Sequence, residues 1–223
     1  MQKSATFYSN SISKNILLTF SIPLGILVIV TVALTQEPRL RLLHCALELF
    51  AEHGYDAVGV QRIVVAAGVT KPTLYHHFGN KRGLLDALLA AHFSPFNERL
   101  RQVAAYHHDL TQTLEQVSAT YIAASLSEPN FTRLRLTLWF APSESEAFRS
   151  VTPWLEEQEH LIAELFENAS EDHGNMRGRQ LTLASSFLGT LNTYVGLSLN
   201  GYLELNEETR HQMLRHYMYG IFS

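Results

Sequence analysis

Cysteine is almost absent from this 223-residue chain, whose single thiol belongs to Cys45. One cysteine forms no disulfide within the chain and builds no cysteine-rich zinc site. This usage is typical of a protein of the reducing cytoplasm, which is the location that we expect.

Recognisable catalytic motifs are also missing from the sequence. There is no Gly-x-Ser-x-Gly nucleophile turn, no phosphate-cradling glycine loop and no metalloprotease helix with two histidines. Eleven histidines are present, but the pairs His76-His77 and His107-His108 are adjacent, so their side chains diverge on a helix. His211 and His216 are five residues apart, not the three or four that place two ligands on one face. We therefore expect no enzyme activity, no cofactor and no metal site.

Acidic residues are absent between Asp56 and Asp86, in a chain whose formal net charge is -4. The same stretch carries four basic residues, Arg62, Lys71, Lys81 and Arg82. A local basic face is sufficient to bind phosphates whatever the net charge of the protein. By charge alone, the stretch would equally suit the solvated face of an ordinary helical protein.

The residues around this stretch predict three short helices. Apolar residues at helical spacing predict the first helix, with Thr35 as its cap: Leu40, Leu43, Ala46, Leu47, Phe50 and Ala51. Gly54 suits its C-terminus, and a second helix is expected over 60–66. Gly68 then supplies a turn that needs positive φ.

The third helix begins at Thr70, a natural N-cap, with Pro72 in its first turn. Gly79 ends it and Asn80 caps the next helix, so that Lys81 lies at a helix N-terminus that favours a phosphate. Leu74 and Phe78 face the core, whereas the outward side chains can reach base edges or phosphates: Thr70, Lys71, Thr73, Tyr75 and His76. This order of turn, helix and cap predicts a helix-turn-helix that lays one helix in the DNA major groove.

At this point the chain resembles the tetracycline-repressor (TetR) family of bacterial regulators. The matching residues are Leu47–Tyr55, Ile63, Ala67–Phe78, Lys81 and Leu84-Leu85, within about 38–93. The resemblance implies an all-α homodimer, in which three N-terminal helices bind DNA and a larger helical domain binds a small ligand that lowers operator affinity. It assigns DNA contacts to Gln61, Arg62, Thr70, Lys71, Pro72, Thr73, Tyr75, His76 and Lys81.

Three positions depart from the family pattern. Gly59 stands where a Thr or Ser usually caps the second helix, so no hydroxyl is available there for a phosphate. Gly83 replaces a usual acidic residue, so no capping box closes the fourth helix. Val64 replaces a usual small alanine.

Residues 16–34 are uncharged and almost wholly apolar, which is long enough for a helix that spans a bilayer. One interpretation is a membrane anchor, although Lys3 and Lys14 would then oppose the positive-inside tendency. A secretory signal is a second, but it would export a DNA-binding domain. We favour a third, a misassigned start site with the native protein beginning near Val30 to Leu34. A membrane partner is expected only if residues 16–34 are real.

We expect three segments: an apolar extension (1–35), the helix-turn-helix domain (36–93) and a helical domain for ligand binding and dimerisation (94–223). The last segment holds nine Lys/Arg against sixteen Asp/Glu, a net charge of -7, and should not bind DNA. Helices are expected at 80–93, 94–107, 110–127, 130–140, 144–149, 152–170, 177–200 and 206–222, the last capped by Asn206.

Aromatic residues with few charges suggest an apolar ligand cavity with a polar handle. The candidates are Tyr106, Tyr121, Arg135, Trp139, Phe140, Trp154 and Asn192. The last two helices are apolar enough for a four-helix dimer interface or for the core of a single chain. The interface candidates are Leu181, Leu188, Leu191, Val195, Leu214 and Tyr217.

The sequence therefore predicts a dimeric repressor that binds a palindromic operator and is released by a small, largely apolar effector. Two alternatives remain open. One is a membrane-tethered regulator of the same kind, and the other is a helical enzyme or small-molecule-binding protein that does not bind DNA.

Overall fold

The computed structural model of the chain describes residues Glu37–Gly220. The expectations for residues 1–35, including an anchor, a signal or a late start, lie outside the described residues. The described part is helical and without strands, so the predicted all-α fold is confirmed. None of its helices is both long enough and apolar enough to cross a bilayer.

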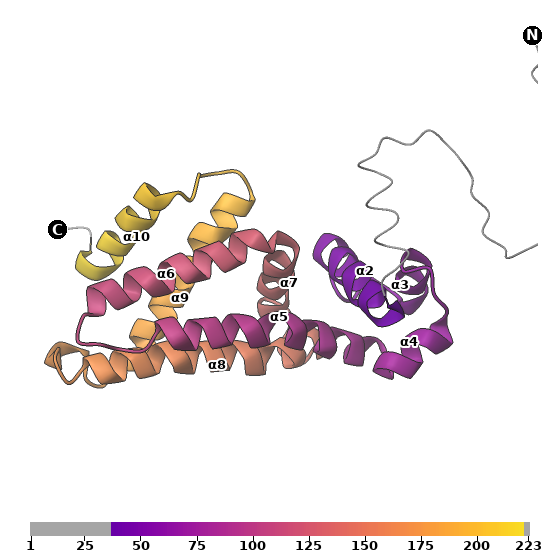
Figure 1. Cartoon of the computed structure of the whole chain (residues 1–223), viewed down its shortest axis with the longest axis horizontal. Helices are drawn as coiled ribbons and strands as arrows, with labels where there is room; N and C mark the ends of the chain where they lie inside the picture. Colours follow the sequence, from indigo (N-terminus) through magenta and orange to yellow (C-terminus); the bar gives the residue numbers. More distant parts are fainter. Residues whose placement is uncertain (1–36, 221–223) are drawn as a thin grey trace, which may run out of the picture. The chain divides into compact units, whose positions relative to one another are not determined.

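Three helices open this part of the chain: α2 (Pro38–His53), α3 (Val60–Ala66) and α4 (Lys71–Phe78) (Figure 1). Leu42, Ala46 and Phe50 form the buried face of α2. Leu40 was expected on that face, but 48% of it is exposed and Leu42 takes its place. Several leucines lie close together at the start of the helix, so the spacing alone did not identify which of them is buried.

The fourth helix is the long α5 (Lys81–Val103), which passes without interruption through the expected break at 93/94. Pro95 lies inside it, although an internal proline removes a backbone hydrogen bond. Phe93 and Phe96, on either side of the proline, are both buried. Their burial in one continuous core accounts for a single helix here, so the prediction of two helices was wrong.

The remaining helices are α6 (Leu110–Ser127), α7 (Pro129–Trp139), α8 (Glu146–Ala169), α9 (Gln180–Leu199) and α10 (Glu207–Tyr219), with a 3-10 turn at Gly174–Met176. The prediction had divided α8 at Pro153, which instead lies exposed within one helix. In Figure 1, α5 and α8 run side by side along their length, and α9 packs on α8. Buried residues from α2 to α10 form one hydrophobic cluster.

Candidate nucleic-acid interface and ligand cavity

The turn between α3 and α4 sets the angle between the two helices. Gly68 has φ +62°, and the amides of Gly68 and Val69 donate to the carbonyls of Val65 (3.2 Å) and Val64 (3.0 Å). A side chain at position 68 would be strained at that φ, which explains the glycine. Ile63 and Leu74 are fully buried and hold α3 and α4 against the core.

Both ends of α4 are defined by caps, as predicted. The Thr70 hydroxyl accepts from the Thr73 amide at 3.4 Å and lies 2.9 Å from the Thr73 hydroxyl. Gly79 ends the helix with φ +75°, and the Asn80 side chain accepts from the Gly83 amide at 2.8 Å. The caps fix where α4 begins and ends, and therefore which side chains it presents.

The outer surface of α3 and α4 carries most of the predicted DNA contacts. Seven of these side chains are exposed: Gln61, Arg62, Thr70, Lys71, Pro72, Tyr75 and His76. Thr73 and Lys81 are half-buried. Val65, which sequence reasoning overlooked, is 68% exposed and lies one turn from Gln61 on α3. Its apolar side chain suits a thymine methyl group or a sugar, and no sequence signal distinguished it from its buried neighbour Val64.

Lys81 makes contacts within the chain that the sequence did not predict. Its ammonium donates to the carbonyls of Tyr55 (3.0 Å) and Val58 (3.2 Å) and lies 4.0 Å from the centre of the Tyr55 ring. Two of its three N–H donors therefore hold the loop between α2 and α3, and one remains. Lys81 is thus an anchor of the helix-turn-helix as well as a candidate phosphate contact.

Gly83, one of the departures from the family pattern, has a structural reason. A Cβ at this position would lie 2.0 Å from the carbonyl oxygen of Phe78, the last residue of α4. That separation is far inside van der Waals contact, so the tight connection between α4 and α5 leaves no room for a side chain.

Tyr55 connects this region to α8. Its side chain is buried, and its hydroxyl donates to the Glu146 carboxylate at 3.1 Å. Burial, together with the hydrogen bond to Glu146, raises the pKa of Tyr55 well above its usual range, so the phenol keeps the proton that it donates. The first turn of α8 is therefore hydrogen-bonded to the loop that Lys81 holds.

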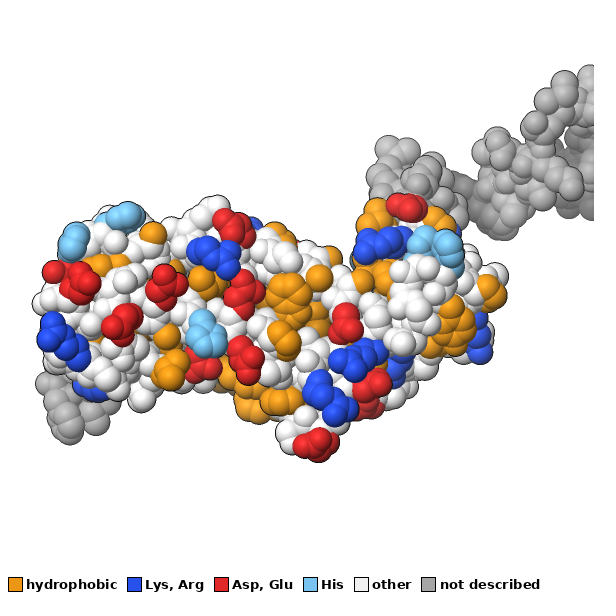
Figure 2. Space-filling view, turned by 90° about the horizontal axis from the view of Figure 1, so that it is seen from below, with side chains coloured by type: hydrophobic (Ala, Val, Ile, Leu, Met, Phe, Trp, Pro, Cys, Tyr) orange, Lys and Arg blue, Asp and Glu red, His pale blue; other side chains and the backbone are white. Residues whose placement is uncertain are grey.

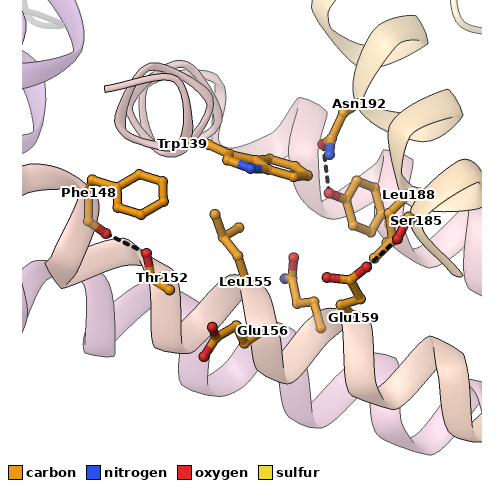
Figure 3. A pocket seen from close by; sticks show the side chains of 11 residues that line it. Trp139, Phe148, Thr152, Leu155, Glu156, Glu159, Ser185, Leu188 and Asn192 are labelled. Carbon is orange, nitrogen blue, oxygen red and sulfur yellow. Dashed lines mark hydrogen bonds between the residues drawn. The ribbon is translucent and has the colours of Figure 1, made fainter. Parts of the chain in front are cut away.

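A cavity of about 250 Å³ lies among α6, α7, α8 and α9 (Figure 3). Three of the seven predicted ligand residues line it, namely Tyr121, Trp139 and Asn192. The wall also contains Phe148, one of the aromatic residues that suggested a cavity, and Leu188, which was expected at the dimer interface. The sequence did not single out its other residues, which are Thr152, Leu155, Glu156, Gln158, Glu159 and Ser185. Most of these come from α8, whose residues converge only once α7 and α9 pack beside it.

A chain of buried polar groups lies behind one wall of the cavity. The Tyr121 hydroxyl donates to Asn192 Oδ1 at 2.7 Å and accepts from Arg135 Nη1 at 2.5 Å. Arg135 is 1% exposed, donates also to the Ser125 hydroxyl, and lies over the Tyr121 and Phe96 rings. The predicted polar handle is therefore present, but Arg135 supports Tyr121 from behind instead of lining the cavity.

The other three predicted ligand residues lie elsewhere. Phe140 is 84% exposed because α7 ends at Trp139, and Trp154 stacks on Phe93 at 5.6 Å. The Tyr106 hydroxyl donates to Asp172 at 2.8 Å. Partial desolvation and that hydrogen bond raise the pKa of Tyr106 to about 12. Aromatic character alone did not separate these residues from the cavity wall.

The predicted dimer residues divide into buried and accessible groups. Four of them are buried within the single chain and so offer no surface to a second copy: Leu188, Leu191, Val195 and Leu214. Tyr217 is half-buried, with its hydroxyl donating to the Leu183 carbonyl at 2.8 Å. Leu181 is 60% exposed. The apolar spacing on α9 therefore identified the face that packs against other helices of the same chain.

Among the described residues, no group of three or more His, Cys, Asp or Glu is placed to hold a metal ion.

The larger helical part of the chain carries a negative net charge. Acidic side chains are scattered over the larger helical part of the chain in Figure 2. This distribution agrees with the net charge of -7, nine basic minus sixteen acidic residues, counted over 94–223.

An exposed helix that follows a tight turn, here joined through α5 to a helical part that contains a cavity, is typical of the helix-turn-helix class of DNA-binding proteins. Residues 42–88 match the sequence model of the bacterial regulatory proteins of the tetR family. This region is therefore similar to the DNA-binding part of TetR-family regulators. The proteins that it matches are regulators of transcription, not enzymes.

The curated relatives match about a third of the chain. The transcriptional repressor KstR2 of Rhodococcus jostii is 37% identical over 82 residues, which are 37% of this chain and 40% of the relative. The transcriptional activator FasR of Mycolicibacterium smegmatis is 40% identical over 79 residues, 35% and 36% of the two chains. The matched region thus spans about two fifths of these relatives, of which one is a repressor and the other an activator.

Solved structures share the fold over nearly the whole described chain. The fatty acid degradation regulator FadR of Bacillus halodurans has a TM-score of 0.69 at 19% identity, covering 84% of this chain and 97% of its own. FadR of Bacillus subtilis, solved in complex with stearoyl-CoA, has a TM-score of 0.69 at 20% identity, with 82% and 98% covered. At such identities the likeness establishes the fold and leaves the ligand of this chain open.

Proposed function

We propose that this protein is a ligand-responsive repressor, which binds a near-palindromic operator as a homodimer and releases it when a small molecule enters the cavity. The observation that carries the proposal is the exposed face of α4, capped at Thr70 and Gly79, on the same chain as a cavity lined by residues of α6, α7, α8 and α9. Lys71, Tyr75 and His76 are the proposed phosphate contacts, with Thr73 and Gln61 proposed at bases or sugars.

A dimer is part of the proposal because one short recognition helix gains useful affinity through two half-sites. The accessible face of α9 supports it: Leu181 and Leu197 are 60% and 38% exposed. Gly189 and Gly196 have open space at their Cβ positions, so another helix can approach closely there. We therefore place the interface on this outer face of α9, together with α10.

Ligand response requires a connection between the cavity and the recognition helix. Helix α8 supplies it, because Phe148 lines the cavity two residues after Glu146, which binds Tyr55. A ligand that moves the first turn of α8 would shift the loop held by Lys81 and change the spacing of two recognition helices in a dimer. The operator must then weaken ligand binding by the same factor.

The first test is selection of bound duplexes from a random DNA pool by the full chain. We expect enrichment of one palindromic site. His76→Ala should weaken binding to that site, whereas His160→Ala, on the exposed face of α8, should not. Binding that is non-specific and equally salt-sensitive in all three proteins would contradict the proposed operator recognition.

A further inference from the structure

We propose that the cavity binds a small organic cation, with an apolar or aromatic body and a protonated amine whose counter-ion is Glu159. This inference deepens the ligand-response part of the proposed function and rests on it. It names a chemical class of effector from the charge, the hydrogen-bonding groups and the aromatic surfaces of the wall.

The charge of the wall is negative. Glu156 and Glu159 line the cavity, and no lysine, arginine or histidine does. Glu159 is half-buried and accepts a hydrogen bond from the Ser185 hydroxyl, as Figure 3 shows. Among the described residues, no cation lies within ion-pair distance of it. A carboxylate that is partly withdrawn from water in this way favours an ammonium ligand, because the positive charge of the ligand compensates the negative charge of the carboxylate.

The neighbouring Glu157 is also half-buried, but it has a basic partner within the chain. The Glu157 carboxylate accepts from Arg101 at 2.7 Å and from Asn97 at 2.8 Å. Glu157 is therefore paired with Arg101 of α5, whereas Glu159 lines the cavity.

The remaining polar groups of the wall offer mainly acceptors. Gln158 uses its Nε2 to donate to Asn97 at 2.8 Å, which leaves Oε1 as the free end of that amide among the described contacts. Thr152 donates its proton to the Phe148 carbonyl, and Tyr121 donates its proton to Asn192 Oδ1, which leaves the Asn192 Nδ2 as the free donor among these groups. A ligand that brings N–H donors therefore fits this wall better than one that brings only acceptors.

The aromatic side chains of the cavity wall also suit an organic cation. Trp139, Phe148 and Tyr121 line the cavity, together with Leu155 and Leu188. Figure 3 shows Leu155 between Phe148 and Trp139. Aromatic faces attract an ammonium group as well as apolar surface, and tryptophan does so most strongly. The volume of about 250 Å³ suits a small ligand with a single ring.

Arg135 is the feature that would favour an anion, because it is buried without a carboxylate and its Nε has no partner. It is not part of the cavity wall, however, and its two Nη atoms donate to Tyr121 and Ser125. An anion in the cavity would meet Glu159, with Tyr121 between it and Arg135. The geometry therefore favours a cation.

The test compares three probes of matched shape on the full chain: 2-phenylethylamine at neutral pH as the cation, propylbenzene as its neutral isostere, and 3-phenylpropionate as the anion. Binding is followed by calorimetry and by tryptophan fluorescence, to which Trp139 in the cavity wall and Trp154 both contribute. We expect the amine to bind at least tenfold more tightly than either of the others. Equal binding of the neutral probe, tighter binding of the anion, or no binding of the amine would overturn the proposal.

Two variants identify the counter-ion. Glu159→Gln should abolish the preference for the amine while it preserves the weaker binding of propylbenzene, which reports an intact cavity. Glu167→Gln makes the same charge change on an exposed part of α8 and should leave the preference intact. A preference that survives in Glu159→Gln would refute the role of Glu159.

Operator binding without any probe is measured separately, so that the two proposals can fail independently. An amine-selective protein that still binds its operator, with the amine bound, would retain the inference and overturn ligand release. An operator-binding protein without amine selectivity would overturn the inference alone.

Discussion

Replacement of Lys81 by alanine tests the unexpected contacts of its ammonium group. The substitution removes two hydrogen bonds to backbone carbonyls and the contact with the Tyr55 ring. Hydrogen bonds to charged groups contribute about 1.5–3 kcal/mol each. Because the site is half-buried and water can reach the freed carbonyls, we expect a loss of about 2 kcal/mol in the free energy of unfolding, measured by urea denaturation.

The adjacent Arg82 provides the matched control. It is exposed and lies 3.8 Å from Asp86, an ion pair of the kind that contributes about 0.5 kcal/mol or less. Arg82→Ala should therefore leave the unfolding midpoint almost unchanged. A Lys81→Ala protein as stable as Arg82→Ala would refute the argument that Lys81 anchors the loop between α2 and α3.

The same variant decides whether Lys81 also contacts a phosphate. Each phosphate contact contributes about 0.9 to the slope of log K against log salt, so its loss from both protomers of a dimer should lower the slope by about 1.8. We expect that decrease, with all DNA sequences weakened alike. An unchanged slope would leave Lys81 with its structural role and remove it from the DNA contacts.

Three further substitutions test other parts of the structure. Gly83→Ala should lower the free energy of unfolding by about 1–3 kcal/mol, since its Cβ would overlap the Phe78 carbonyl; an unchanged thermal midpoint would contradict that clash. Thr73→Ala should alter the relative affinities of operator variants, and a uniform loss in binding assays would mean that Thr73 does not contribute to specificity. Tyr55→Phe should retain operator binding but reduce the ligand-induced loss of affinity, because the bond to Glu146 is removed; an unchanged ligand effect would exclude this route.

The caps of the helices were predictable because they depend on chemistry within four residues. Thr70, Asn80 and Asn206 each accept from the amide three positions later, as their side chains and positions in the sequence predict. The positive φ of Gly68 and Gly79 follows from the same local reasoning. These features define the helix-turn-helix, which is why its surface could be identified from the sequence.

The cavity and the interior of the larger helical part were less predictable, because tertiary packing decides them. Trp139 and Phe140 are neighbours in the sequence, but only Trp139 lines the cavity, and the end of α7 separates them. Leu188 and Leu191 share apolar spacing with a dimer face, yet both are buried in the single chain. Periodicity identifies the apolar face of a helix and leaves the identity of its partner undetermined.

The burial of Tyr55 bears on how a ligand could control DNA binding. A ligand shifts a conformational equilibrium only if it binds the two states differently, so the cavity must change shape between the free and the DNA-bound forms. Phe148 and Glu146 lie in the first turn of α8, and a change in the cavity wall there alters the position of the carboxylate that Tyr55 requires. Because the Tyr55 hydroxyl has little access to water, loss of that partner is costly, and the loop held by Lys81 must follow α8 or leave a buried donor unsatisfied. The hydrogen bond between Tyr55 and Glu146 therefore couples the position of this loop to that of α8, as the proposed response to ligand requires.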